Sequence, residues 1–116
     1  MKIEMYTTTD GKKPFSDWFD GIKNEVQKIR VIKKLEFLRI ENFSNCKPVG
    51  EDVFERKLFS IRIYFLKYKN AVILLLLGGE KDKQQQRDIE KAKKYAKDFL
   101  EKEQKNEKKQ NKNEKF

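Results

Sequence analysis

Residues 53–79, VFERKLFSIRIYFLKYKNAVILLLLGG, decide the fold class because they predict three consecutive β-strands. The expected strands cover 53–59, 61–68 and 71–77. In the second, Ile61, Ile63 and Phe65 alternate with polar neighbours, which is typical of a strand with one buried face. The third is a continuous apolar run, too short for a typical buried helix, and it indicates a central strand buried on both faces.

Helical spacing around this meander predicts three helices, beginning at Pro14, near Val26 and near Gln84. The residues expected on their inner faces are Phe15, Trp18, Phe19 and Ile22; Val26, Ile29, Ile32, Leu35 and Leu38; and Ile89, Ala92, Tyr95, Ala96 and Phe99. A strand over 2–8 opens the chain, and 42–50 is expected to be a loop. The order β-α-α-β-β-β-α predicts an α+β domain with its helices on one face of a small, mainly antiparallel sheet.

The charged residues divide the chain into a domain over 1–100 and a tail over 101–116. The tail is almost entirely Lys, Glu, Gln and Asn, and such a segment buries too little apolar surface to order itself, so we expect a frayed helix end that runs into a disordered tail. It holds six Lys and four Glu, which is +2 of the total +9, so the domain holds +7. A basic domain indicates an anionic partner such as nucleic acid or an acidic protein.

Several classes of protein are excluded by what the sequence lacks. No apolar stretch suits a signal peptide or is long enough to span a bilayer, so we expect no membrane association. The single cysteine, Cys46, excludes an internal disulfide and favours the reducing cytoplasm. The absence of histidine excludes Ser-His-Asp and Cys-His catalysis, and an ordinary zinc site is not expected. We expect no cofactor, so any catalysis depends on Lys, Arg, Tyr or carboxylates.

Two groups of residues are candidates for chemistry. If the apolar set faces the helices, period two places Arg62 and Tyr64 on the bare, solvent-facing side of the sheet, where a guanidinium beside an aromatic ring suits single-stranded RNA. The alternative is an edge-strand charge that prevents aggregation. Lys81, Lys83 and Arg87 follow the Gly-Gly pair, and the alternative there is a plain turn with solvated charges. The cations of the second helix, Lys28, Lys33 and Lys34, are expected to form a solvated face, and the alternative there is contact with the antitoxin or the ribosome.

Several motifs in order resemble the RelE/ParE superfamily of type II toxins, specifically its HigB-like addiction module killer group. The matching stretches are Pro14-Phe15-x-x-Trp18, Arg39, Glu41-Asn42-Phe43, Lys47-Pro48-Val49-Gly50-Glu51, Phe54-Glu55, Arg62-Ile63-Tyr64-Phe65, Leu75-Leu76-Leu77-Gly78-Gly79-Glu80-Lys81 and Gln86-Arg87-Asp88-Ile89-x-x-Ala92. They cover about residues 3–99. The resemblance implies a small antiparallel sheet with helices packed on it. It also implies an endoribonuclease that cleaves mRNA on the ribosome and is neutralised by a helix-turn-helix, HigA-like antitoxin.

The resemblance also implies which residues act. Arg62 matches the family's strand arginine, Lys57 takes its Glu-Leu-Arg arginine position with Arg56 one residue out of register, and Lys81 ends its Gly-Gly-Asp-Lys stretch. Lys57, Arg62 and Lys81 are therefore the expected catalytic residues. The expected RNA-binding residues are Arg56, Tyr64, Lys83 and Arg87. The chain departs from the family at the hairpin, where Phe59-Ser60-Ile61 replaces a longer Tyr-Gly-Pro-Gly-Tyr-like turn.

In the mechanism that these residues permit, the ribose 2′-oxygen attacks the adjacent phosphate, Arg62 stabilises the phosphorane, and Lys57 or Lys81 accepts the proton. One alternative is a non-catalytic, ParE-like inhibitor that binds a protein such as DNA gyrase. Another is a purely structural interaction module. A nuclease requires Lys57, Arg62 and Lys81 to converge on one face of the protein, whereas an inhibitor does not.

Overall fold

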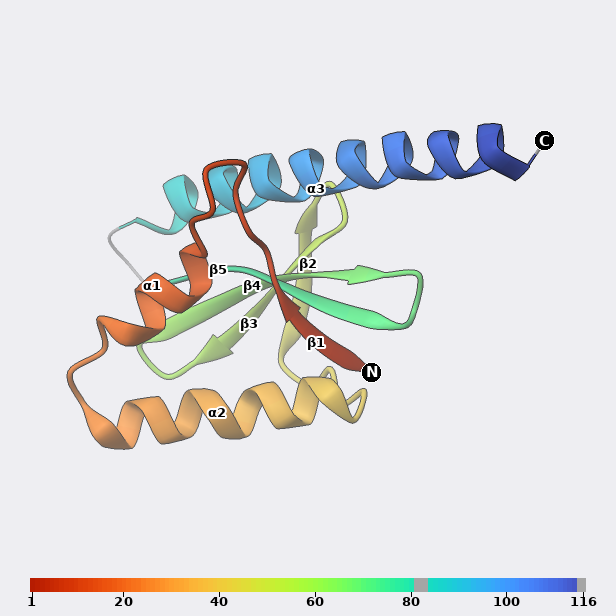
Figure 1. The fold of residues 1–116 in the computed structure, drawn as a ribbon. Helices are drawn as coiled ribbons and strands as arrows, with labels where there is room; N and C mark the ends of the chain where they lie inside the picture. Colours follow the sequence, from red (N-terminus) through yellow and green to blue (C-terminus); the bar gives the residue numbers. More distant parts are fainter. Residues whose placement is uncertain (81–83, 115–116) are drawn as a thin grey trace.

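A five-stranded sheet lies between α1 and α2 on one side and α3 on the other (Figure 1). The computed structural model describes residues 1–80 and 84–114, with side chains described as far as Asn106. The elements in chain order are β1 (Lys2–Met5), α1 (Pro14–Asp20), α2 (Glu25–Arg39), β2 (Cys46–Gly50), β3 (Val53–Leu58), β4 (Ile61–Tyr68), β5 (Val72–Glu80) and α3 (Gln85–Glu114). This is the α+β class that the sequence predicts.

The sheet has the strand order β1-β5-β4-β3-β2. The predicted meander is confirmed, since β3, β4 and β5 pair antiparallel in sequence order. The sheet as a whole is mixed, because β1 runs parallel to β5. Residues 46–50, expected to be loop, form the edge strand β2. Proline has no backbone N–H, and Pro48 is tolerated there because some N–H groups of an edge strand pair with no neighbouring strand.

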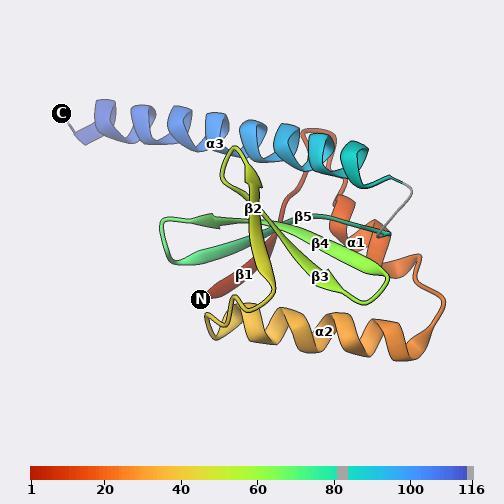
Figure 2. The same cartoon turned by 180° about the vertical axis from the view of Figure 1, so that it is seen from behind.

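The helices cover both faces of the sheet, and the expectation of a single covered face is wrong (Figure 2). One core, around Ile63 and Phe65, packs against α1 and α2, and the other, around Leu66 and Leu74, packs against Ala92 and Ala96 of α3. The physical reason lies in β5, whose apolar run exposes hydrophobic side chains on both sides and therefore needs cover on both. No helix among the described residues is long and apolar enough to cross a membrane.

The second helix contains a further correction. Val31 and Leu38 are fully buried, whereas Val26, Ile29 and Ile32, expected on the inner face, are 55%, 52% and 55% exposed. A helix turns by about 100° per residue, so a strict three-residue spacing moves about 60° around the helix at each step. Over the run from Val26 to Leu38 the apolar residues therefore pass from the outer face to the inner one.

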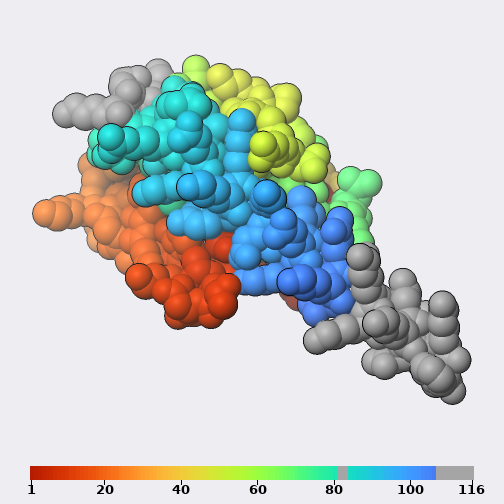
Figure 3. All heavy atoms as spheres, turned by 90° about the horizontal axis from the view of Figure 1, so that it is seen from above, coloured from red at the N-terminus to blue at the C-terminus, as the bar shows by residue number. Residues whose placement is uncertain are grey.

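The last helix extends past the sheet, and the molecule measures 54 × 28 × 24 Å. Its backbone is helical through Glu114, beyond residue 101, where the sequence predicted a disordered tail. Lys, Glu and Gln are good helix formers, and Glu101 and Lys105 have the i,i+4 spacing that favours a helix. Seen from above, α3 runs between the loop that follows β1 and the turn that joins β2 to β3 (Figure 3).

Candidate nucleic-acid interface

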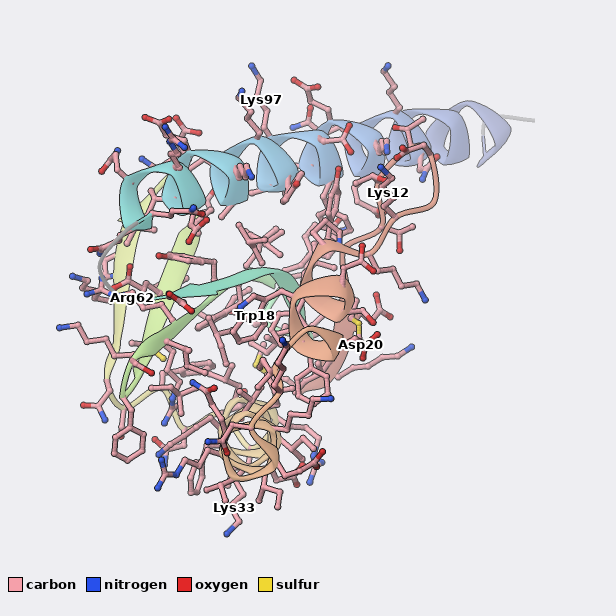
Figure 4. All side chains as sticks on the ribbon, turned by 90° about the vertical axis from the view of Figure 1, so that its left-hand side faces the viewer. Lys12, Trp18, Asp20, Lys33, Arg62 and Lys97 are labelled. Atoms are coloured by element: carbon pink, nitrogen blue, oxygen red, sulfur yellow. The ribbon has the colours of Figure 1, made fainter. Side chains whose placement is uncertain are left out.

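Two of the predicted site residues lie side by side on the sheet face that α3 covers. Lys57 of β3 and Arg62 of β4 are cross-strand partners, and Arg62 is also the partner of Gly79 in β5. Their neighbour Tyr64 belongs to the core under α3, whereas Trp18 and Leu35 pack on the opposite face. These three cross-strand partners, Lys57 of β3, Arg62 of β4 and Gly79 of β5, are called the basic row after its two cations. Figure 4 shows Arg62 between the strands and the start of α3, away from α2.

A buried carboxylate organises the basic row. Glu55 is fully buried, and its Oε1 accepts a hydrogen bond of 2.8 Å from Nη1 of Arg62. Lys47 Nζ lies 3.6 Å from the same oxygen, and Gln85 Nε2 donates to Oε2 at 3.1 Å. The carboxylate therefore connects β2, β3 and β4 with the first turn of α3. Glu55 is not among the site residues predicted from the sequence, although its spacing from Lys57 places both on one strand face.

The expectation that Arg62 and Tyr64 face open solvent is wrong. Arg62 is 5% exposed and Tyr64 is fully buried, because α3 covers the face that was expected to be bare. Burial, reinforced by the Glu55 and Asp88 carboxylates, raises the pKa of the Tyr64 hydroxyl above its usual range. Among the described residues, neither this hydroxyl nor Nε of Arg62 has a hydrogen-bond partner. Tyr64 is thus core, without a ring available for base stacking.

The other site residues predicted from the sequence do not all lie in the basic row. Arg56 projects to the other side of the sheet, where it is 2% exposed and its Nη1 donates to the Asn42 carbonyl oxygen at 2.9 Å. Successive residues of a strand point to opposite faces, so Arg56 and Lys57 lie on opposite sides of the sheet. Of these two candidates for the family's arginine position, only Lys57 lies in the basic row. Arg87 is exposed in the first turns of α3. Lys81 and Lys83 lie outside the described residues.

A cleft of about 630 Å³ opens beside the basic row, between α1, the start of β4, the end of β5 and the start of α3. Its charged lining residues in the described part of the chain are Asp17, Lys23, Glu80 and Asp88. These described residues bring three carboxylates against one ammonium group, so they do not by themselves attract the RNA backbone. In the described part of the chain, no group of three or more carboxylate or cysteine side chains is arranged to hold a metal ion.

Asp88 is the unusual carboxylate of this cleft. It is 7% exposed, and burial raises its pKa, against a smaller opposing effect of Lys91. A Cβ atom on Gly79 would lie 2.1 Å from Asp88 Oδ2, so the missing side chain makes room for the carboxylate. Gly78 makes similar room for the Trp18 ring on the other face, and both glycines lie within β5 instead of ending it as expected. Asp88 is not among the site residues predicted from the sequence, although it belongs to the Gln86-Arg87-Asp88-Ile89 motif.

Comparison with known proteins gives one informative relative. No family model matches the chain. A protein of Haemophilus influenzae, described as an uncharacterized protein, is 30% identical over 101 residues, which cover 85% of this chain and 98% of that protein. The chain belongs to the family of this protein. The match over nearly the whole length of the relative indicates that the family shares the α+β domain.

For this member of the family, two adjacent places with opposite charge meet at Gly79. Gly79 pairs with Arg62 of the basic row, and it lies against Asp88 of the acidic cleft. A guanidinium and a carboxyl group thus approach the same glycine from a strand and from a helix. Such a combination can bind an anion on one side and exchange a proton on the other.

Proposed function

We propose that this protein is a RelE/HigB-type endoribonuclease, the toxin of a type II toxin-antitoxin system that cleaves mRNA and is held inactive by a helix-turn-helix antitoxin. The ordered motifs over residues 3–99 support the proposal, and the α+β fold is compatible with it. The observation that carries it is the cross-strand pairing of Lys57 with Arg62, because it aligns two cations on one face.

The basic row suits a phosphodiester whose negative charge grows during the reaction. Adjacent strands hold Lys57 and Arg62 at a defined separation, and Glu55 fixes the orientation of the guanidinium through Nη1. Positioned donors are most effective where charge develops in the transition state. Lys57 is exposed and reaches solvent, so it is the residue that RNA meets first.

The proposed reaction is a transfer within the RNA chain. The ribose 2′-oxygen forms a bond to the adjacent phosphorus while the bond to the 5′-oxygen breaks, which leaves a 2′,3′-cyclic phosphate and a 5′-oxygen that takes a proton from water to become the 5′-hydroxyl. We assign the 2′ proton to the Asp88 carboxylate, in place of the lysines that the sequence suggested. Asp88 and Arg62 share Gly79 as a neighbour, and a raised pKa makes a carboxylate a stronger base.

Phosphate binding by Arg62 has an obstacle, because its guanidinium is buried and already paired with Glu55. A phosphate has to compete with Glu55 for the guanidinium or use its remaining N–H groups. Binding on the ribosome supplies a route, since orientation of the substrate alone is worth about 7–11 kcal/mol. We therefore propose that mRNA is cleaved on the ribosome and that free RNA is a poor substrate.

The test is primer extension on a translated message after expression of the full chain in a bacterial host. Cleavage within codons is expected, with a decrease of about a hundredfold or more in Glu55→Gln/Arg62→Gln, which removes both charges of the buried pair together. Lys57→Gln is also expected to lose cleavage. Because Lys57 is exposed, this variant should fold, and its loss of cleavage would not be caused by misfolding. Lys97→Gln, on the outer side of α3, is the matched control (Figure 4). An uncut message in cells whose growth arrests would contradict the nuclease.

A specific observation favours the second candidate, a ParE-like inhibitor without catalysis. The ion pair with Glu55 neutralises Arg62, which does not affect an inhibitor, whereas a phosphate clamp has to compete with it. Plasmid topology followed in the same cultures separates the two functions. Altered supercoiling with an intact message would identify a gyrase-type target.

A further inference from the structure

The large hydrophobic residues exposed in the described structure are concentrated in one place. They are Met5, Val26, Ile29, Ile32, Phe37, Ile40 and Phe59. All except Met5 belong to α2, to its C-cap, or to the turn that joins β3 to β4 beside it. We define the α2 outer face as Val26, Ile29, Ile32, Phe37, Ile40 and Phe59. Their exposed fractions run from 37% to 71%, well above what a helix packed against a sheet needs to leave uncovered.

The geometry of α2 places most of these apolar residues on one side of the helix, with Lys33 between Ile29 and Phe37. At about 100° per residue, Val26, Ile29, Phe37 and Ile40 lie within roughly 80° of one another around the helix, opposite the buried Val31 and Leu38. The helix therefore has a second apolar stripe that the fold itself does not use. Figure 4 shows Lys33, which lies within this stripe, pointing away from the sheet.

The turn beside α2 extends this surface. Phe59 is 71% exposed and has a φ of 51°, a left-handed conformation that a non-glycine residue adopts at a cost of about 1–2 kcal/mol. It occupies the first of two turn residues, where hairpins favour glycine. Arg30 lies over its ring at 4.4 Å, and a groove of about 260 Å³ separates the ring from the N-terminal part of α2. A strained aromatic displayed to solvent beside a groove is typical of a contact residue.

The charges around the α2 outer face select the kind of partner. The helix carries five cations, Lys28, Arg30, Lys33, Lys34 and Arg39, and two anions, Glu25 and Glu36, which gives +3. Glu36 is already paired with Arg39. Two copies packed through this face would bring +3 against +3, so the face disfavours a second copy of the chain. Four of the six residues of this face are aliphatic, which also disfavours RNA, because base stacking needs flat rings.

We propose that the α2 outer face docks an acidic, amphipathic helix of a partner protein. The apolar side of that helix covers the stripe from Val26 to Ile40, a large side chain fills the groove beside Phe59, and its carboxylates face the lysines and arginines that flank the stripe. The groove holds Asn24, Gln27 and Ser60, whose polar groups suit a protein side chain better than acyl chains of a membrane. The proposal does not depend on RNA cleavage, because the basic row lies on the opposite face of the sheet.

The test uses two synthetic helical peptides and the full chain labelled with ¹⁵N. One peptide has Leu at positions i, i+3, i+4 and i+7 and Glu at the outer positions, and the other has Lys in place of each Glu. The Glu peptide is expected to shift amide resonances of α2 and of the 58–61 turn, and to bind about tenfold or more tightly than the Lys peptide. Ile29→Glu/Ile32→Glu is expected to weaken binding at least about tenfold.

Both isoleucines are more than half exposed, so the double variant should fold, and Ile29→Ser/Ile32→Ser provides a milder pair for the same measurement. Lys97→Glu, on the outer side of α3, is the control and should bind the Glu peptide as the parent does (Figure 4). Several results would overturn the proposal: equal binding of both peptides, shifts confined to α3, self-association that Ile29→Glu/Ile32→Glu abolishes, or sedimentation with anionic vesicles in preference to the Glu peptide.

Discussion

Arg62 donates a hydrogen bond of 2.8 Å from Nη1 to Oε1 of Glu55, and the two side chains are 5% and 0% exposed. A buried ion pair of this kind means that neither residue can be changed alone without leaving an uncompensated charge in the core. Removing one partner of a buried pair costs about 3–5 kcal/mol, whereas replacing both is far less harmful. The relationship therefore governs how the proposed activity is tested.

The first prediction is a double-mutant cycle at this pair. Arg62→Gln and Glu55→Gln should each lower the free energy of unfolding by about 3–5 kcal/mol, because each leaves its partner's charge buried. The double variant should cost clearly less than the sum of the two, since two amides can hydrogen-bond without net charge. Urea unfolding of the three variants measures this coupling. Strictly additive losses would show that the pair contributes nothing as a pair.

The second prediction compares the two adjacent glycines of β5. A Cβ atom at Gly78 would lie 2.1 Å from Trp18 Cε3, and an indole ring within a packed face has little room to move. Gly78→Ala should therefore destabilise the protein by about 1–3 kcal/mol and change the Trp18 emission spectrum. Gly79→Ala meets only the end of the Asp88 carboxylate, which can rotate, so its cost should be smaller. Thermal unfolding of the two variants in parallel checks the order, and a reversed order would contradict the packing.

The third prediction concerns the pH dependence of stability at Asp88. Burial raises the pKa of this carboxyl group above 3.8, so the folded state binds its proton more tightly than the unfolded state does. Ionised Asp88 therefore weakens folding above the folded pKa, and this penalty disappears as the pH falls below about 3.8. Asp88→Asn should be more stable than the parent at pH 7 and should lose that advantage near pH 3.5.

Several charged groups surround Asp88 and belong in the comparison. Lys91 lies on its own helix, Asp17 and Glu80 line the same cleft, and Tyr64 faces it from β4. Among the described residues, Lys91 is the cation that lowers the Asp88 pKa, so Lys91→Gln should enlarge the advantage of Asp88→Asn at pH 7. An advantage that is the same at both pH values would assign the effect to packing instead of charge.

The fourth prediction concerns the C-terminal part of α3. Among residues 101–106, Lys102 makes the contacts to the rest of the domain, with Asp98 at 2.9 Å and with Thr9 Oγ1 at 3.0 Å. Exposed pairs of this kind contribute about 0–1 kcal/mol each. A chain ending at Leu100 should therefore unfold within a few degrees of the full chain in a thermal scan, about 4–8 °C per kcal/mol being typical for its size. A larger drop would mean that the segment docks on the domain.

The meander could be predicted from the sequence because its information is local. Alternation over 61–68 predicted β4 to the residue, and the apolar run after it predicted the start of β5 to within one residue, although β5 continues to Glu80. The two-residue turn at Phe59-Ser60 also makes the pairing of Lys57 with Arg62 follow from counting back along the hairpin. The strand β2 could not be found this way, since Pro48 and Gly50 are poor strand formers and only pairing with β3 orders them.

Burial on the second face of the sheet was harder to predict. Alternation shows which residues share a face, but it does not show what covers that face. Arg62 and Tyr64 were assigned to an open surface, whereas α3 encloses them and Glu55 neutralises the charge of Arg62. The outer stripe of α2 was missed for a related reason, because apolar spacing alone does not distinguish contact with this chain from contact with another.

The parallel pairing of β1 with β5 determines when the protein can finish folding. Lys2 is the register partner of Val72, so the first strand waits for the last one while almost the whole domain is synthesised. Loop closure over such a separation is slow compared with local helix formation, and synthesis proceeds at about 5–20 residues per second. Until β5 leaves the ribosome, the inner sides of α1 and α2 have no complete sheet to cover them. The nascent chain thus exposes apolar surface before it is a folded domain, and the basic row, which includes Gly79 of β5, is among the last features to form.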